Sequence, residues 1–141
     1  MSFAGFSDLN WWAVLVAAFV YFILGAGWYN PSAFGSRWMR SIGWDPGARP
    51  TMGAVAYVGP LVAYLAISIS LGLLAEATAT DTLLEGFILG LIVGLGIVTA
   101  IILVTAVFDP MKPQPMTWFA ITAGYHYIGI LIAAMIIGAW Q

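Results

Sequence analysis

The chain has 141 residues, of which 62% are hydrophobic and only 7% are charged. Since a soluble domain carries about a quarter charged residues, this composition excludes a water-exposed globule and predicts a protein embedded in lipid. The net charge of -2, without any run of Lys or Arg, excludes a nucleic-acid partner, and the absence of cysteine excludes disulfides and thiolate chemistry.

The expected fold is all-α, a single integral membrane domain over residues 1–141. Its length suits four transmembrane helices of roughly 20 residues each with short loops. The expected elements are spans at about 9–29, 52–74, 83–107 and 116–140, and one interfacial amphipathic helix at about 32–43.

Aromatic residues stand at the ends of the predicted spans, where amphipathic rings favour the headgroup level of a bilayer. The residues before the first span include no Lys or Arg, so we expect this span to stay in the mature protein rather than to act as a cleaved signal. The predicted interfacial anchors are Trp11, Trp12, Trp28, Tyr29, Trp38, Trp118 and Trp140.

The segment after the first span has an amphipathic pattern. Phe34, Trp38 and Ile42 recur at intervals of four, whereas Arg37 and Arg40 lie elsewhere around the helix. Because the segment is too short to cross a membrane, we expect it to lie flat in the interface with its arginines towards the headgroups.

The third span carries glycines at Gly86, Gly90 and Gly94, which share one face of a helix. Such a stripe lets another helix backbone approach closely. We therefore expect the third span to be the central packing strut. In the fourth span, Ala120 and Gly124 offer a second small-residue pair.

The basic residues predict the orientation. Arg37, Arg40 and Arg49 lie in the first loop and Lys112 in the third, whereas the second loop and the termini have none. The positive-inside rule then places the first and third loops in the cytoplasm and both termini outside.

His126 is the most suggestive single residue, because it falls near the middle of the membrane. At a rise of about 1.5 Å per residue, Tyr21, Tyr64 and Thr99 come to the same level, so we predict a mid-membrane polar cluster of these four residues. His126 then serves as a proton relay, a substrate contact, an axial ligand to haem or a pigment, or a packing residue hydrogen-bonded to another helix.

Asp81 and Glu85 form an acidic pair at the outer end of the third span. They mark either an entrance for cations or protons, or a favourable interaction with the positive end of the helix dipole. With one histidine and no cysteine, we expect no metal site and no resident cofactor.

Several short stretches form a recognisable pattern. Two small residues precede Trp-Tyr-x-Pro, and Phe-Gly and then Trp-Met follow. A separate Gly-Tyr-His tripeptide comes later in the chain. The stretches are Asn10-Trp11, Gly25-Ala26-Gly27-Trp28-Tyr29-Asn30-Pro31, Phe34-Gly35, Trp38-Met39, Gly124-Tyr125-His126, Gly138 and Trp140. In these the chain resembles a family of small bacterial membrane proteins, domain of unknown function 1761; spans two and three match it only in hydropathy. The resemblance implies a four-span protein of bacterial type and supplies no catalytic residues.

Three functions are compatible with these features. A structural or accessory subunit that packs into a homo-oligomer or a larger complex is favoured by short loops, glycine faces and the lack of a reaction motif. A small oligomeric transporter or channel using His126 is the alternative, followed by a haem- or pigment-associated subunit; an enzyme acting on lipid or quinone is least supported. We expect a non-enzymatic protein of the bacterial inner membrane, with lipid and other membrane subunits as its partners.

Overall fold

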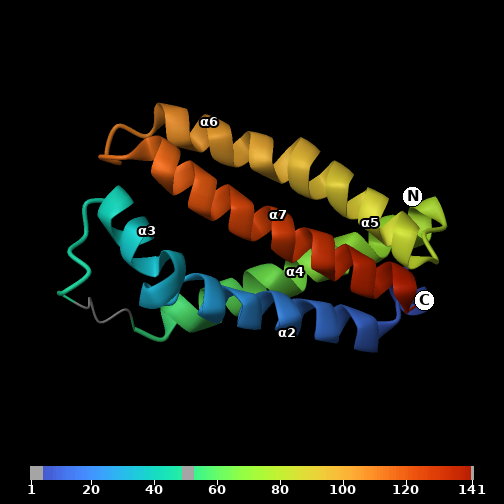
Figure 1. Cartoon of the computed structure of the whole chain (residues 1–141). Helices are drawn as coiled ribbons and strands as arrows, with labels where there is room; N and C mark the ends of the chain where they lie inside the picture. Colours follow the sequence, from blue (N-terminus) through green and yellow to red (C-terminus); the bar gives the residue numbers. More distant parts are fainter. Residues whose placement is uncertain (1–4, 49–52, 141) are drawn as a thin grey trace.

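A computed structural model describes residues 5–48 and 53–140 of the chain. Within these residues every regular element is a helix, and four spans are long and apolar enough to cross a membrane. The predicted all-α, four-span fold is therefore confirmed (Figure 1). The spans are α2 (Trp11–Trp28), α4 (Val55–Thr78), a composite of α5 (Leu83–Leu91), η2 (Ile92–Thr99) and α6 (Ala100–Phe108), and α7 (Pro115–Ala139); the shorter elements are α1 (Gly5–Asp8), η1 (Pro31–Gly35) and α3 (Ser36–Ser41).

The second span differs most from its predicted bounds. Residues 75–78 lie beyond its predicted end at residue 74, but they continue α4, and Ala75 is buried against the bundle. The helix ends where Ala79 adopts a left-handed conformation, with φ of 51°. Pro60 lies inside this helix, which continues through it. Met52, the predicted start of the span, and Arg49 of the first loop lie outside the described residues.

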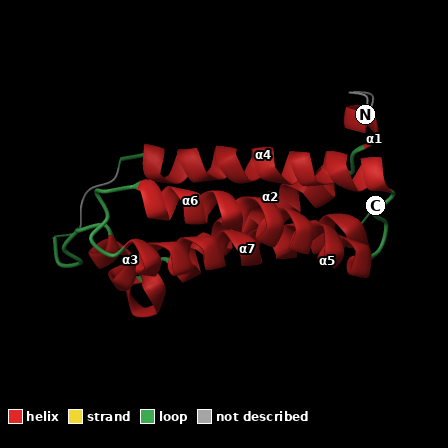
Figure 2. Ribbon diagram, turned by 90° about the horizontal axis from the view of Figure 1, so that it is seen from above, coloured by secondary structure: helices red, strands yellow, loops and turns green. Residues whose placement is uncertain are grey.

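The centre of the fold is α7, which lies against α2, α4, α3 and the third span (Figures 1 and 2). In their most apolar 18-residue windows, 44% of the α7 residues are buried but only 17% of those in the third span. The prediction that the third span is the central strut is therefore wrong. The glycines of the third span let one of its faces pack closely against another helix. By contrast, α7 has small residues on several sides, including Gly129, Ala133 and Gly138, and packs closely against several helices.

The ends of the first and last spans are joined directly. The Asn10 side chain accepts a hydrogen bond from the Ala13 backbone N–H and thereby caps α2. Its amide Nδ2 also donates to the Trp140 carbonyl oxygen at 2.8 Å. One residue thus starts α2 and holds it beside the last turn of α7.

The predicted flat interfacial helix over 32–43 is broken and held against the protein. Ala33 has non-helical angles (φ -97°, ψ -105°), which separate η1 from α3. The Gln114 N–H donates to the Ser41 carbonyl oxygen at 3.2 Å, and the segment ends at Gly43, with φ of 79°. Since α3 also packs on α7, this segment forms a bridge across one end of the bundle (Figure 1).

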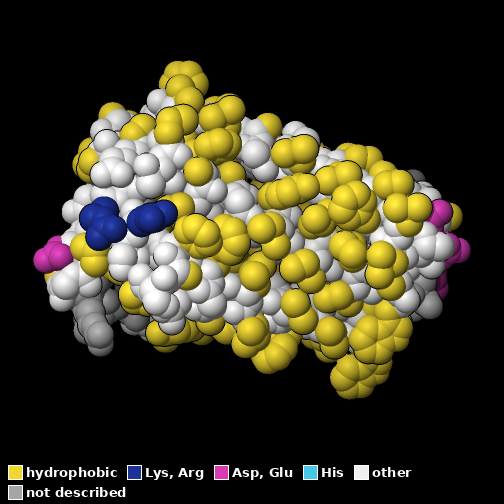
Figure 3. All heavy atoms as spheres, viewed as in Figure 1, with side chains coloured by type: hydrophobic (Ala, Val, Ile, Leu, Met, Phe, Trp, Pro, Cys, Tyr) yellow, Lys and Arg dark blue, Asp and Glu magenta, His cyan; other side chains and the backbone are white. Residues whose placement is uncertain are grey.

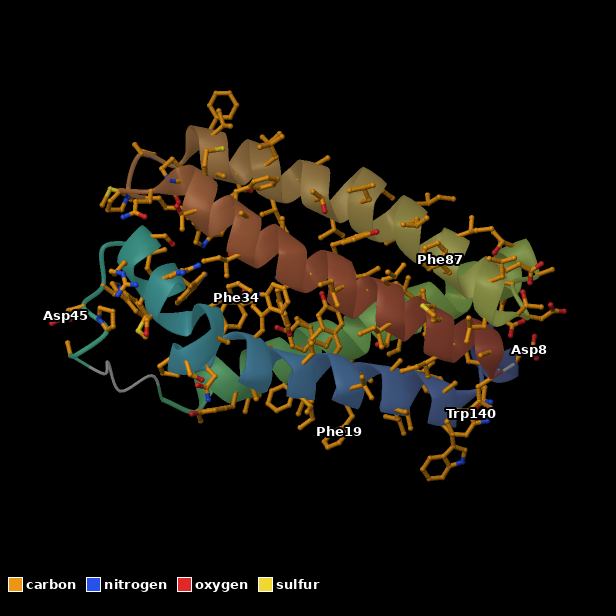
Figure 4. All side chains as sticks on the ribbon, viewed as in Figure 1. Asp8, Phe19, Phe34, Asp45, Phe87 and Trp140 are labelled. Atoms are coloured by element: carbon orange, nitrogen blue, oxygen red, sulfur yellow. The ribbon has the colours of Figure 1, made fainter. Side chains whose placement is uncertain are left out.

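Hydrophobic side chains cover the middle of the molecule, and the Lys and Arg side chains in view gather at the α3 end (Figure 3). Of the labelled side chains, Phe19 and Trp140 point away from the bundle, whereas Phe34 lies between the η1–α3 bridge and α7 (Figure 4). This apolar belt with polar ends is the surface expected of a multi-pass membrane protein.

Candidate functional site

A hydrogen-bonded pair lies in the middle of the bundle. Tyr21, which is 1% exposed, places its hydroxyl 2.6 Å from Nδ1 of His126 and 3.3 Å from the His126 carbonyl oxygen. The Tyr21 ring stacks on Tyr64 with centroids 4.3 Å apart and planes at 12°. The structure thus brings together three of the four residues predicted for the mid-membrane cluster.

Thr99, the fourth predicted member, does not contribute its hydroxyl to this cluster. It donates to the Gly94 carbonyl oxygen, 2.8 Å away and five residues earlier in the same span. The bond spans five residues within the π-helical segment η2, in which the backbone hydrogen bonds have the same spacing. The depth of Thr99 was estimated from its sequence position, but depth does not determine the direction of a side chain around its helix.

Tyr125 belongs to the cluster and was not predicted. It is fully buried, its hydroxyl donates to the Tyr21 carbonyl oxygen at 3.1 Å, and its ring lies 4.9 Å from that of His126. The signal that could have found it is the Gly124-Tyr125-His126 tripeptide, which the resemblance singled out only for its histidine.

A glycine makes room for the pair. A Cβ added at Gly129 would overlap the ring of Tyr21, so only glycine at this place lets the ring lie against the α7 backbone. Tyr21 is therefore held by α7 on one side and by Tyr64 on the other.

The pair determines what His126 can do chemically. With the phenol proton on Tyr21, Nδ1 of the imidazole accepts and the imidazole proton resides on Nε2. A neutral histidine with one ring nitrogen satisfied is the form that a membrane interior tolerates. In this tautomer Nε2 can donate a proton or a hydrogen bond, but it has no free lone pair with which to ligate a metal or haem iron. Within residues 5–48 and 53–140 no group of three His, Cys, Asp or Glu side chains could hold a metal ion.

A cleft of about 950 Å³ lies beside this cluster, between α2, the η1–α3 bridge with its following connector, and the first turns of α4. Its volume is within the range of about 300–1,000 Å³ typical of ligand sites. Tyr64 and Tyr125 belong both to its wall and to the mid-membrane cluster. The described lining residues are Phe22, Gly25, Ala26, Tyr29, Pro31, Gly35, Trp38, Met39, Trp44, Pro46, Ala56, Tyr57, Pro60, Tyr64 and Tyr125.

Two indoles connect this end of the molecule to α7. Trp28 donates its indole N–H to the Ile121 carbonyl oxygen at 3.1 Å, and Trp38 donates to the Thr122 hydroxyl at 3.2 Å. Tyr29 packs edge-on against the ring of Trp38, with centroids 5.5 Å apart. Trp28, Tyr29 and Trp38, predicted as interfacial anchors, are thus half-buried, with rings that contact α7 or one another.

The other predicted anchors lie nearer the surface. Trp11, Trp12 and Trp140 are exposed at the opposite end of the bundle. Trp118 is partly covered by the ammonium group of Lys112, which lies 4.2 Å from the centroid of the indole. Lys112 also pairs with Asp109, and this ion pair lowers the pKa of the Asp109 carboxyl.

The glycine stripe of the third span packs against α7. A Cβ at Gly86 would lie 2.5 Å from the Ala134 carbonyl oxygen, and one at Gly90 would lie 2.9 Å from Cα of Leu131. Gly94 faces the Tyr127 ring at 3.2 Å. The close helix contact predicted for the stripe is therefore made within one chain.

The predicted small pair of the fourth span has a different outcome. Gly124 lies against the Trp28 indole, from which an added Cβ would be 3.4 Å away. Ala120 is exposed. The two residues therefore do not form a common seam with another helix.

At the N-terminal end of the third span, Glu85 completes a capping box. Its Oε2 accepts from the backbone N–H groups of Asp81 and Thr82, each at 3.1 Å, and the Thr82 hydroxyl accepts from the Glu85 N–H. Asp81 and Thr82 thus hold the Glu85 carboxylate at the helix terminus, as the interpretation based on the helix dipole requires.

A family model described as "Protein of unknown function (DUF1761)" matches residues 12–138, a range that includes both members of the Tyr21–His126 pair. No curated protein and no solved structure matches the chain. The matched range includes nearly all of the four apolar helices. The chain therefore belongs to this family of uncharacterised multi-span membrane proteins.

Proposed function

We propose that the protein is a non-enzymatic structural subunit that assembles with a second copy of itself in the membrane, through the outer face of α4. The observation that carries this proposal is a row of small residues on the exposed side of that helix. Successive members are three, four or seven residues apart, so they follow one face of a helix. The row consists of Gly59, Ala63, Ala66, Ser70 and Ala77.

This row is unlike the surface that the same protein turns to lipid elsewhere. The outer side of the third span presents large apolar side chains, including Ile92, Leu95 and Ile101. Acyl chains pack well against such residues, whereas small residues allow a second helix backbone to come close. A Cβ at Gly59 would meet no atom within 4 Å, so space is open at the start of the row.

The glycines of the third span cannot provide the same contact. Gly86, Gly90 and Gly94 are covered by α7, and a second copy cannot reach them while the bundle is intact. Since the stripe of the third span is occupied within the chain, we assign the contact between copies to α4.

Bulky residues in this row are expected to dissociate the dimer. Ala63→Leu and Ala66→Leu should each raise its dissociation constant about tenfold, a loss of about 1.4 kcal/mol, because the larger side chain would hold the two helix backbones apart. The measurement is single-molecule photobleaching of labelled protein in lipid bilayers over a range of protein-to-lipid ratios.

The matched control is Ala100→Leu, since Ala100 is also an exposed helical alanine but lies on the third span. It should dimerise like the wild type. A wild-type protein that stays monomeric at every ratio, or Ala63 and Ala66 variants that pair normally, would refute the proposal.

For the orientation, we infer that the α3 end faces the cytoplasm of a bacterial inner membrane. The described basic residues Arg37, Arg40 and Lys112 are at this end, and this distribution supports the inference through the positive-inside rule. A reporter that is active only outside the cytoplasm should be active when fused after Gln141 and silent when fused after Ala48. The reverse pattern of activity would overturn the orientation.

A further inference from the structure

The wall of the 950 Å³ cleft differs from the lipid-facing surface of the protein. Its described lining includes seven aromatic residues and no Leu, Ile or Val. These branched aliphatic residues dominate the exposed face of the third span, for example at Ile92, Leu95 and Val104. A wall shaped for acyl chains would resemble that face, so the cleft suits a different kind of molecule.

The cleft also lacks charge but not hydrogen-bond donors. No Asp, Glu, Lys, Arg or His is among its described lining residues, so the buried part of an occupant should be neutral. Tyr57 and Trp44 line the cleft, and both are exposed. Tyr57 carries a hydroxyl and Trp44 an indole N–H, and each is a hydrogen-bond donor that an oxygen acceptor could use.

The aromatic residues of the cleft wall are held in place by one another. Tyr64 stacks on Tyr21 on the side away from the cleft, and Tyr125 packs edge-on against Tyr29, with centroids 5.1 Å apart. Gly25, also in the lining, has so little room beside the Tyr125 hydroxyl that a Cβ would lie 2.8 Å from it. Rigid rings beside small residues suit a flat ring, which aromatic walls favour through stacking.

The side of the cleft formed by α4 is exposed. The first turns of α4 beside it are exposed, with Val55 81% and Tyr57 67% accessible. A ligand could therefore place its ring in the cleft while an apolar tail remains among lipid chains.

From these observations, we propose that the cleft binds a neutral lipophile with a flat ring bearing carbonyl oxygens, the quinone class, with Tyr57 and Trp44 as donors to those oxygens. This proposal is independent of assembly through α4. The cleft is lined by Ala56, Tyr57 and Pro60, whereas the small-residue row begins at Gly59 and continues along a different side of the helix.

The test uses the full chain in phosphatidylcholine nanodiscs titrated with decylubiquinone. Since Trp38 and Trp44 line the cleft, we expect a saturable loss of tryptophan fluorescence above the linear collisional quenching by quinone dissolved in the bilayer. Ala56→Phe fills the cleft from α4 and should abolish the saturable part. Ala100→Phe adds the same ring to the lipid face of α6 and should retain it.

A second variant removes one of the two proposed donors without changing the size of the cleft. Tyr57→Phe keeps the ring and removes one hydroxyl, so it should raise the decylubiquinone concentration at half-saturation about three- to tenfold. Decanol, which has the same tail length and no ring, should not compete.

Three outcomes overturn the proposal. They are a wild-type protein with only linear quenching, an equal response of the Ala56 and Ala100 variants, and competition by decanol or by an anionic phospholipid at the potency of the quinone. The last result would assign the cleft to lipid chains instead.

Discussion

Gly86→Ala is expected to lower the free energy of unfolding by roughly 1–3 kcal/mol, although alanine is the better helix former. The new methyl group would lie 2.5 Å from the Ala134 carbonyl oxygen and 3.0 Å from Cα of Met135. Both are backbone atoms, so no rotation of a side chain can relieve the contact, and α5 and α7 must move apart. Thermal unfolding of the purified protein in detergent, followed by tryptophan fluorescence, measures the loss.

The control for this variant is in the same span. A Cβ at Gly96 would meet nothing within 4 Å, so Gly96→Ala should be neutral or up to about 1 kcal/mol more stable, through its better helix propensity. Equal melting temperatures for the Gly86 and Gly96 variants would show that α5 and α7 are not in close contact.

Gly129→Ala is expected to cost roughly 3 kcal/mol, because the added methyl group would overlap the Tyr21 ring. That ring cannot easily move aside. It stacks on Tyr64 at 4.3 Å, and its hydroxyl is bonded to His126. The same thermal unfolding experiment measures the loss, and near-ultraviolet circular dichroism should show altered packing of the tyrosines.

A double-mutant cycle identifies the cause. Tyr21→Ala removes the obstructing ring, so the two changes together should cost clearly less than the sum of their separate costs. Gly124→Ala serves as the positional control, since its methyl group would meet only the edge of the Trp28 indole, at 3.4 Å. Additive costs would mean that Tyr21 does not lie against Gly129.

The candidate cluster was only partly predictable. Helical rise determines how deep a residue lies in a span, and this was enough to bring Tyr21, Tyr64 and His126 to one level. It was not enough for Thr99, whose hydroxyl bonds to its own helix, or for Tyr125, which enters the cluster through its contact with Tyr21. Neither outcome follows from depth, since both depend on how the helices are rotated against one another.

The positions of the tryptophans were also only partly predictable from the sequence. A tryptophan at the end of a span can lie among headgroups or donate its N–H to a neighbouring helix, and its position in the sequence is the same in both cases. Trp12 is 72% exposed, as the first position requires. Trp28 and Trp38 take the second, because the η1–α3 bridge holds them against α7. The cleft that this bridge forms with α4 has no signature in the sequence.

The sequence by itself determined that the protein is an all-α membrane bundle with four spans, because long apolar stretches in lipid must satisfy their backbone hydrogen bonds within helices. It also determined that Gly86, Gly90 and Gly94 mark a close helix contact. Only the tertiary structure decided that α7 is the central helix and that the glycine face is used within the chain, leaving the small face of α4 uncovered. A small residue permits close approach by any helix, and the partner is chosen by the simultaneous packing of all four spans.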